Sequence, residues 1–353
     1  MVDELKKEVF MKKYFIVFLM TSLIFTGCST KTKSSTVESS TIESTTIESS
    51  STQAQTTESV KSTKPINYTW DPTIYSKAYV EYLGKDTEKM YQEMVEAILN
   101  REDSFSCNRA YYEQIPIIIK TCFPCAEYFV DYGTLEDNKT VSLKYTVSKK
   151  KQQSIIKKFG ERVEELICGS VYEGDSDTVA AIAVYNSFCK GLQYDDNAVD
   201  SDNSDDVSPY RAIMEGTGIC QSFAPAYAHL CVQLQIPACS TGGISSDNSQ
   251  SHEWTQLKLD GVYYYADPTW QTNGGLEWFG FTSKYREEHD DYLASMQNIG
   301  ELNLARADEV PIGDDRFDEL RNCVYNVEIT RQKNTLFIHA SGEDGTPVTV
   351  TIE

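Results

Sequence analysis

The chain has 353 residues, and its 53 acidic side chains outnumber 32 basic ones, which gives a formal net charge of −21 at pH 7. Such an acidic surface repels phosphate backbones, so nucleic acid is excluded as an expected partner. Hydrophobic residues make up 40% of the sequence, which is enough to build one large domain or two small ones.

Residues 1–28 have the pattern of an export signal. A Lys-Lys pair precedes an apolar stretch, residues 14–25, that is shorter than the roughly 20 residues a membrane-spanning helix needs. The stretch is followed by a small residue, Gly27, and then Cys28. This pattern resembles a bacterial lipoprotein signal peptide, which implies that Cys28 becomes a lipidated N-terminus on the extracytoplasmic face of the cell membrane. An ordinary secretory signal that happens to contain a cysteine is the alternative.

Residues 29–66 are dominated by serine and threonine and contain few large apolar side chains. A near-repeat, Ser-Thr-Val-Glu-Ser-Ser and Ser-Thr-Ile-Glu-Ser-Thr, is typical of low-complexity chain. Because such a segment buries too little apolar surface to offset the entropy cost of ordering it, we predict a flexible linker between the anchor and a folded domain.

Residues 67–176 are predicted to form the N-terminal part of the folded domain, built from helices and a strand. Residues 86–99 and 149–167 repeat apolar side chains at helical spacing, and residues 140–147 alternate as a half-buried strand does. A further helix is predicted over residues 177–190. The apolar stripes of these elements indicate core packing and nothing more.

An acidic loop follows, with six aspartates in residues 195–206. Several carboxylates in one loop could hold a calcium ion. The stretch lacks the central glycine and the terminal glutamate of a helix-loop-helix calcium motif. A solvated loop is therefore the favoured interpretation, and no metal site is expected here.

Cys220 stands where a glycine-rich turn, starting at Gly216, runs into an alanine-rich apolar helix. At the start of a helix, unpaired backbone N–H groups and the helix dipole stabilise a thiolate. The same N–H groups can bind the oxyanion of an acyl intermediate. A buried core cysteine is the alternative interpretation, and it is the expected one for Cys231 and Cys239.

A β-hairpin is predicted downstream, because Asp260-Gly261 separates two strand-like runs. If Leu259 pairs with Val262, then His252 and Asp267 become diagonal neighbours on one face of the hairpin. Diagonal pairs lie within reach of an imidazole–carboxylate hydrogen bond. The sequence thus predicts a base and the group that orients it.

These three residues suggest a division of labour. Cys220 is the candidate nucleophile, His252 the base that takes its proton, and Asp267 the group that fixes the imidazole tautomer. A zinc protease is excluded, because Gln256 stands where the second histidine of its motif would be. No cofactor is expected.

Eight cysteines remain once Cys28 and Cys220 are set aside, an even number that is compatible with disulfides in an exported protein. Cys122 and Cys125 have the spacing of a redox dithiol but lack the surrounding parallel-sheet pattern. A redox role is therefore the less favoured interpretation. His229, within the helix that Cys220 starts, is expected to be a structural or surface histidine.

The C-terminal part is predicted to begin with a polar helix over about residues 281–303. A β-rich tail, residues 306–353, follows with three short alternating runs at 327–329, 336–340 and 348–352. Asp344-Gly345 marks a turn between the last two runs.

Three motifs in order carry a family resemblance: Gly-Ile-Cys-Gln-Ser-Phe-Ala at Cys220, His-Glu-Trp at His252, and Tyr-Tyr-Ala-Asp-Pro-Thr-Trp around Asp267. They resemble the transglutaminase-like superfamily, in particular its bacterial exported members. The resemblance implies an α+β, papain-like fold, with a core over residues 177–305 in which the Cys220 helix packs on an antiparallel sheet. It also implies that Cys220, His252 and Asp267 form a catalytic triad.

The resemblance implies a cysteine enzyme that forms a thioester on peptide or isopeptide amides of a protein or peptide substrate, cell-wall material included. Water would complete a peptidase reaction and an amine would complete a cross-linking reaction, and hydrolysis is favoured for a bacterial surface protein. The alternative, from another class, is a cell-surface binding module that keeps the fold with an idle triad.

Overall fold

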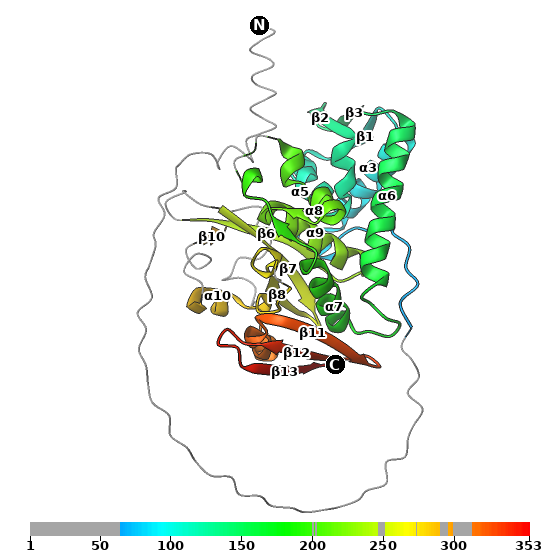
Figure 1. The fold of residues 1–353 in the computed structure, drawn as a ribbon. Helices are drawn as coiled ribbons and strands as arrows, with labels where there is room; N and C mark the ends of the chain where they lie inside the picture. The colour runs from blue at the N-terminus through cyan, green and yellow to red at the C-terminus, as the bar shows by residue number, and fades with distance from the viewer. Residues whose placement is uncertain are drawn as a thin grey trace, which may run out of the picture.

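A five-stranded antiparallel sheet and the helix that begins at Cys220 form the centre of the protein (Figure 1). The structure is a computed structural model that describes residues 64–199, 201, 203–245, 251–272, 274–289, 296–298 and 313–353. The predicted signal peptide with Cys28, and the linker as far as residue 63, lie outside the described residues. Within the described residues, no helix is both long and apolar enough to cross a membrane.

The central sheet has the strand order β10-β6-β7-β8-β9, all neighbours antiparallel. Its strands are β6 Ala238–Ser245, β7 Ser251–Leu259, β8 Val262–Ala266, β9 Phe279–Phe281 and β10 Met296–Asn298. Helix α9, Cys220–Gln233, packs on β6 and β7, and the Thr255 hydroxyl donates to the Ala224 carbonyl oxygen at 2.8 Å. The α+β fold with a cysteine-bearing helix on an antiparallel sheet is confirmed.

The β7–β8 hairpin has the predicted register, because Leu259 pairs with Val262. Its two turn residues, Asp260 and Gly261, have φ angles of 50° and 85°. Positive φ at both positions belongs to the type I′ turn, whose twist matches that of the flanking strands. The turn therefore sets which residues of the two strands face one another.

Helices make up most of the N-terminal part of the chain. The predicted helices at 86–99, 149–167 and 177–190 are α3, α6 and α7, and serine caps begin α6 and α7. A small sheet, β1-β3-β2, contains the predicted strand at 140–147 as β3. The remaining bounds are α2 Lys77–Leu83, α3 Lys85–Asn100, β1 Ser104–Ser106, α4 Arg109–Tyr112, α5 Ile115–Cys122, β2 Val130–Glu136, β3 Thr140–Tyr145, α6 Lys149–Cys168, α7 Asp177–Cys189, β4 Gln193–Tyr194, α8 Pro209–Glu215, β5 Thr217–Gly218 and α10 Ser283–His289.

The segment that leads into α2 is bound to the back of α9 through buried polar contacts. Trp70 Nε1 donates to His229 Nε2 at 3.1 Å, and His229 Nδ1 lies 2.9 Å from the Thr121 carbonyl oxygen. Gln233 Nε2 donates to the Asp71 carbonyl oxygen at 3.0 Å. His229 is fully buried, so its role is structural.

The C-terminal tail forms the three-stranded sheet that the sequence predicted, with β11 Tyr325–Gln332, β12 Thr335–Ser341 and β13 Pro347–Ile352. In Figure 1 this sheet, orange to red, lies beside α7. Arg331 joins it to the body of the protein through Asp175, at 2.6 and 2.8 Å, and Leu336 and Ile338 are buried in the same core as α9.

The prediction of a single helix over residues 281–303 is wrong. Helix α10 covers only Ser283–His289, and Met296–Asn298 is a strand that pairs with β6. The polar composition of this region gave no β signal. The edge of β6 offers unpaired backbone groups, and pairing with them outweighs the local helical pattern.

We predict that His229→Gln makes the free energy of unfolding less dependent on pH in the acid range. Burial lowers the pKa of His229 to about 4, against the opposing effect of its bond to Thr121, whereas an unfolded histidine keeps a pKa near 6.5. As the pH falls from about 6.5 to about 4, the unfolded chain binds a proton that the folded chain does not. The free energy of unfolding then falls by up to about 3 kcal/mol.

Urea unfolding of the full chain at pH 7, 5.5 and 4 measures this effect. Glutamine retains hydrogen-bonding groups and cannot titrate, so the variant should lose less stability across this window than the parent. His339→Gln, at an exposed position on β12, is the matched control. An equal loss in His229→Gln and the parent would contradict the prediction.

Candidate active site

The turn before α9 fixes Cys220 at the first position of the helix. Gly218 has φ 154°, and a Cβ placed there would lie 2.5 Å from the Ser222 side chain, so only glycine fits. Ile219 N–H donates to Ser222 Oγ at 3.3 Å, and Ser222 N–H donates to the Ile219 carbonyl oxygen at 2.8 Å. Cys220 is 9% exposed and, as the first helical residue, has no intrahelical acceptor for its backbone N–H.

His252 and Asp267 form a buried pair, with 2.6 Å between His252 Nε2 and Asp267 Oδ2. Their side chains are 4% and 0% exposed. Asp267 lies one residue beyond the end of β8, where its N–H donates to the Trp278 carbonyl oxygen at 2.9 Å. Its other carboxylate oxygen accepts the Thr269 N–H at 3.0 Å. The carboxylate is thereby held in one orientation against the imidazole.

The Cys220 thiol hydrogen-bonds the same imidazole ring. The structure thus brings together the three residues that the sequence singled out, in the order thiol, imidazole, carboxylate. Their catalytic role stays a prediction.

The surroundings of His252 favour its protonated form, the imidazolium. Burial acts to lower the pKa of His252, but the negative charge of Asp267 and the hydrogen bonds to Asp267 and Cys220 raise it well above its usual value. An imidazolium beside a thiol at a helix N-terminus is the arrangement that stabilises a thiolate at neutral pH. Such a thiolate can attack a carbonyl carbon.

A pocket of about 240 Å³ opens over the imidazole and is lined by Tyr194, His252, Thr269 and Trp270. Tyr194 and Trp270 are 43% and 44% exposed, and the Trp270 ring centroid lies 5.9 Å from that of His252. Sequence reasoning assigned no role to either aromatic. Trp270 ends the third motif, which was its only signal, and Tyr194 lies outside all three motifs.

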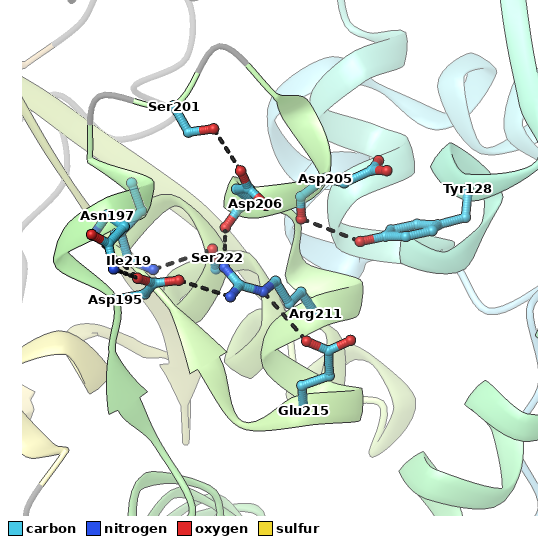
Figure 2. Close-up of polar contacts among 10 residues, drawn as sticks. All are labelled: Tyr128, Asp195, Asn197, Ser201, Asp205, Asp206, Arg211, Glu215, Ile219 and Ser222. Carbon is cyan, nitrogen blue, oxygen red and sulfur yellow. Dashed lines mark hydrogen bonds and ion pairs between the residues drawn. The ribbon is translucent and has the colours of Figure 1, made fainter.

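The acidic loop is held by Arg211 (Figure 2). Arg211 donates to Asp195 Oδ2 at 2.7 Å and to the Asp206 carbonyl oxygen at 3.1 Å, and its Nε lies 3.4 Å from Glu215 Oε2. Part of the loop's negative charge is therefore paired with Arg211. The prediction of a solvated loop did not include this ion pair. No group of three or more His, Cys, Asp or Glu suited to a metal ion occurs among the described residues.

The nine described cysteines are all free, so none of the disulfides that the sequence allowed joins them. Cys122 and Cys125 are fully buried, and burial raises the pKa of Cys122 to about 12 and that of Cys125 well above its usual value. A redox dithiol needs an accessible thiol of low pKa. These two residues serve as core packing, and so do Cys231 and Cys239.

Comparison with known proteins gives a family match over part of the chain. Residues 168–268 match the family model described as the transglutaminase-like superfamily. The match contains Cys220, His252 and Asp267. No curated protein sequence matches the chain.

Two solved structures share weak similarity with the chain. One, described as a TGase, is 13% identical, with 49% of each chain covered and a TM-score of 0.27. The other, described as "a Putative Cysteine Protease from Cytophaga hutchinsonii", is 12% identical, with 64% of this chain and 75% of that chain covered and a TM-score of 0.27. The chain thus spans about half the length of the first of these structures.

We predict that Asp267→Asn lowers the rate at which iodoacetamide alkylates Cys220 at pH 7 by about tenfold or more. Without the carboxylate charge, burial dominates and the pKa of His252 falls, so the ring is neutral and no longer stabilises a thiolate. The difference should shrink toward pH 10, where thiols ionise unaided.

Peptide mapping of alkylated protein across pH 5–10 gives the rate for each cysteine. Asp314→Asn is the matched control, because that carboxylate accepts a hydrogen bond from Tyr264 at 2.7 Å, away from the pocket. Equal rates at pH 7 in Asp267→Asn and Asp314→Asn would contradict a role for Asp267 in activating the thiol.

Proposed function

We propose that this chain, whose residues 168–268 belong to the transglutaminase-like superfamily, is a lipid-anchored extracytoplasmic cysteine enzyme. Its reaction is acyl transfer from peptide or isopeptide amides through a thioester on Cys220. The observation that carries the proposal is the buried 2.6 Å bond between His252 and Asp267, on a ring that the Cys220 thiol also contacts. A histidine oriented by a carboxylate beside a thiol is the arrangement that activates a cysteine nucleophile.

In the first half-reaction, the Cys220 thiolate adds to the amide carbonyl carbon and forms a C–S bond, while the carbonyl π electrons move onto oxygen. The backbone N–H of Cys220 donates to this oxyanion. When the intermediate collapses, the C=O bond re-forms and the C–N bond breaks. The His252 imidazolium gives its proton to the departing amine, and this leaves a thioester and a neutral imidazole.

In the second half-reaction, the neutral imidazole takes a proton from the attacking water or amine, and the thiolate leaves. Water releases a carboxylic acid, and an amine forms a new amide. We favour water, because the two aromatic walls of the pocket are more than 40% exposed and leave the thioester open to solvent. The substrate class proposed is a protein or peptide at the cell surface, cell-wall peptides included.

We predict that Cys220→Ala abolishes both release of free termini from peptides and incorporation of a primary amine into a glutamine-bearing peptide. The alanine removes the only atom that forms the acyl bond, so a loss of more than about 1,000-fold is expected. Cys168→Ala, at a partly exposed thiol on α6, is the matched control and should retain activity.

Mass spectrometry of both peptide products measures this loss. Termini release without amine incorporation would assign a peptidase, and the reverse would assign a cross-linker. Turnover by Cys220→Ala equal to that of Cys168→Ala would contradict the proposal. A wild-type protein whose Cys220 is no more reactive than Cys168 would favour an idle binding module.

For the anchor, we predict that Cys28→Ser moves the protein from the detergent phase to the aqueous phase in Triton X-114 partitioning of expressing bacteria. The reason is that a diacylated cysteine supplies the apolar surface that holds the chain to the membrane. Metabolic labelling with a palmitate analogue should mark the parent and not the variant. Detergent partitioning and labelling that survive Cys28→Ser would contradict a lipid on this residue.

A further inference from the structure

We propose that Arg286 and Trp254 form a binding site for a small monovalent anion, either a halide such as chloride or a simple carboxylate such as formate. The site lies one aromatic ring behind His252, because the Trp254 ring stacks on the imidazole with 5.9 Å between their centroids. Its occupancy is separate from the reaction proposed above and can be measured without a substrate.

Arg286 is buried among aromatic side chains at the central sheet. It belongs to α10 and is 4% exposed. The central carbon of its guanidinium lies 5.4 Å from the Trp254 ring centroid and 5.8 Å from that of Tyr265 (Figure 1). Both rings belong to a hydrophobic cluster with Tyr263 and Phe281. In such apolar surroundings a charge without a partner is costly.

Three side-chain nitrogens at this place are buried without a hydrogen-bond partner. They are Nε and Nη1 of Arg286 and Nε1 of Trp254, and no other side-chain nitrogen of the described residues shares this property. Guanidinium and indole groups can only donate, so the group that satisfies them is an acceptor. The positive charge of the guanidinium makes an anion the favoured acceptor.

Contact with aromatic rings does not replace an acceptor for other arginines of this chain. Arg316 also lies over two rings, at 5.3 and 4.7 Å, and still donates to Asp260 at 2.6 Å. Arg331 lies 4.4 Å from a tyrosine ring centroid and donates to Asp175 at 2.6 Å. Two more arginines lie over rings and donate to oxygen atoms, Arg101 and Arg321. Among the described arginines that lie over rings, Arg286 is therefore the exception.

The nearby amide of Gln256 does not supply the acceptor. Its Oε1 is buried without a partner, two residues along β7 from Trp254. However, its Nε2 donates to the Tyr82 hydroxyl at 2.9 Å, and Oε1 forms no bond to Arg286. A neutral amide would also leave the guanidinium charge unpaired. An anion from solution fits both the charge and the donors.

The burial of the site selects a small occupant of single charge. Trp254, Tyr265 and Phe281 are at most 1% exposed, so a bulky ligand cannot reach the guanidinium without displacing a ring. The cost of burying an ion rises steeply with its charge, which disfavours sulfate and phosphate.

Thermal unfolding of the full chain at constant ionic strength tests this site. A net charge of −21 lets any salt stabilise the fold by screening, so chloride replaces gluconate, an anion too large for the site, at a fixed total concentration. We expect Tm to rise by about 2–4 °C for each tenfold excess of chloride over its dissociation constant. A response to chloride alone would assign a halide site, and a response to formate alone would assign a carboxylate site.

Two variants identify the donors. Arg286→Gln should weaken the apparent chloride affinity by at least about tenfold, and Trp254→Phe, which keeps a ring but removes Nε1, by about threefold. Arg316→Gln is the matched control, because it removes an arginine that lies over two rings but is paired with Asp260. It should keep the response of the parent.

Chloride NMR gives a second readout that needs no unfolding, since the folded parent should broaden the chloride line and Arg286→Gln should not. A parent Tm that is equal in chloride, formate and gluconate would overturn the inference, and so would an anion response of Arg286→Gln equal to that of the parent. If Arg286→Gln does not fold, an unchanged anion affinity in Trp254→Phe would overturn it.

Discussion

The buried bond between His252 and Asp267 is the interaction on which the site depends. A lone carboxylate or imidazolium at these depths would be costly to bury, and removing one partner of such a pair costs about 3–5 kcal/mol. Together the two groups stabilise one another and leave a charged ring that can polarise the Cys220 thiol. The hairpin turn at Asp260-Gly261, the backbone of Trp278 and the N–H of Thr269 all serve to keep this pair in place.

The rest of the fold can be understood as support for the two sides of this contact. Strand β7 carries His252, the end of β8 leads directly into Asp267, and α9 begins with Cys220. The N-terminal segment is bound to the back of α9 through hydrogen bonds from Trp70 to His229 and from Gln233 to Asp71. Arg331 joins the tail sheet to Asp175. Because one hydrophobic core runs through these parts, the N-terminal helices and the β tail stabilise the helix that carries the nucleophile.

Much of this arrangement was predictable from local patterns. The Asp-Gly turn determines the hairpin register from Leu259–Val262 to Thr255–Ala266, and this register directs His252 and Asp267 toward one another just beyond its last pair. The glycines before Cys220 likewise predict a turn into a helix. Strand β10 was not predictable, because it forms only by pairing with β6, which depends on tertiary contacts. The position of Tyr194 at the pocket was not predicted for a similar reason, because a two-residue strand pairs it with Gly218 across 24 positions of sequence.

The proposed reaction requires that Cys220 carries a covalent acyl group during turnover. Rapid quenching of the full-length protein with a glutamine-bearing peptide, followed by peptide mapping, tests it directly. We expect a mass increase on the tryptic fragment that contains Cys220, and hydroxylamine should remove it, as it removes a thioester. An enzyme that turns the peptide over with Cys220 unmodified, or with the adduct on a different cysteine, would contradict it.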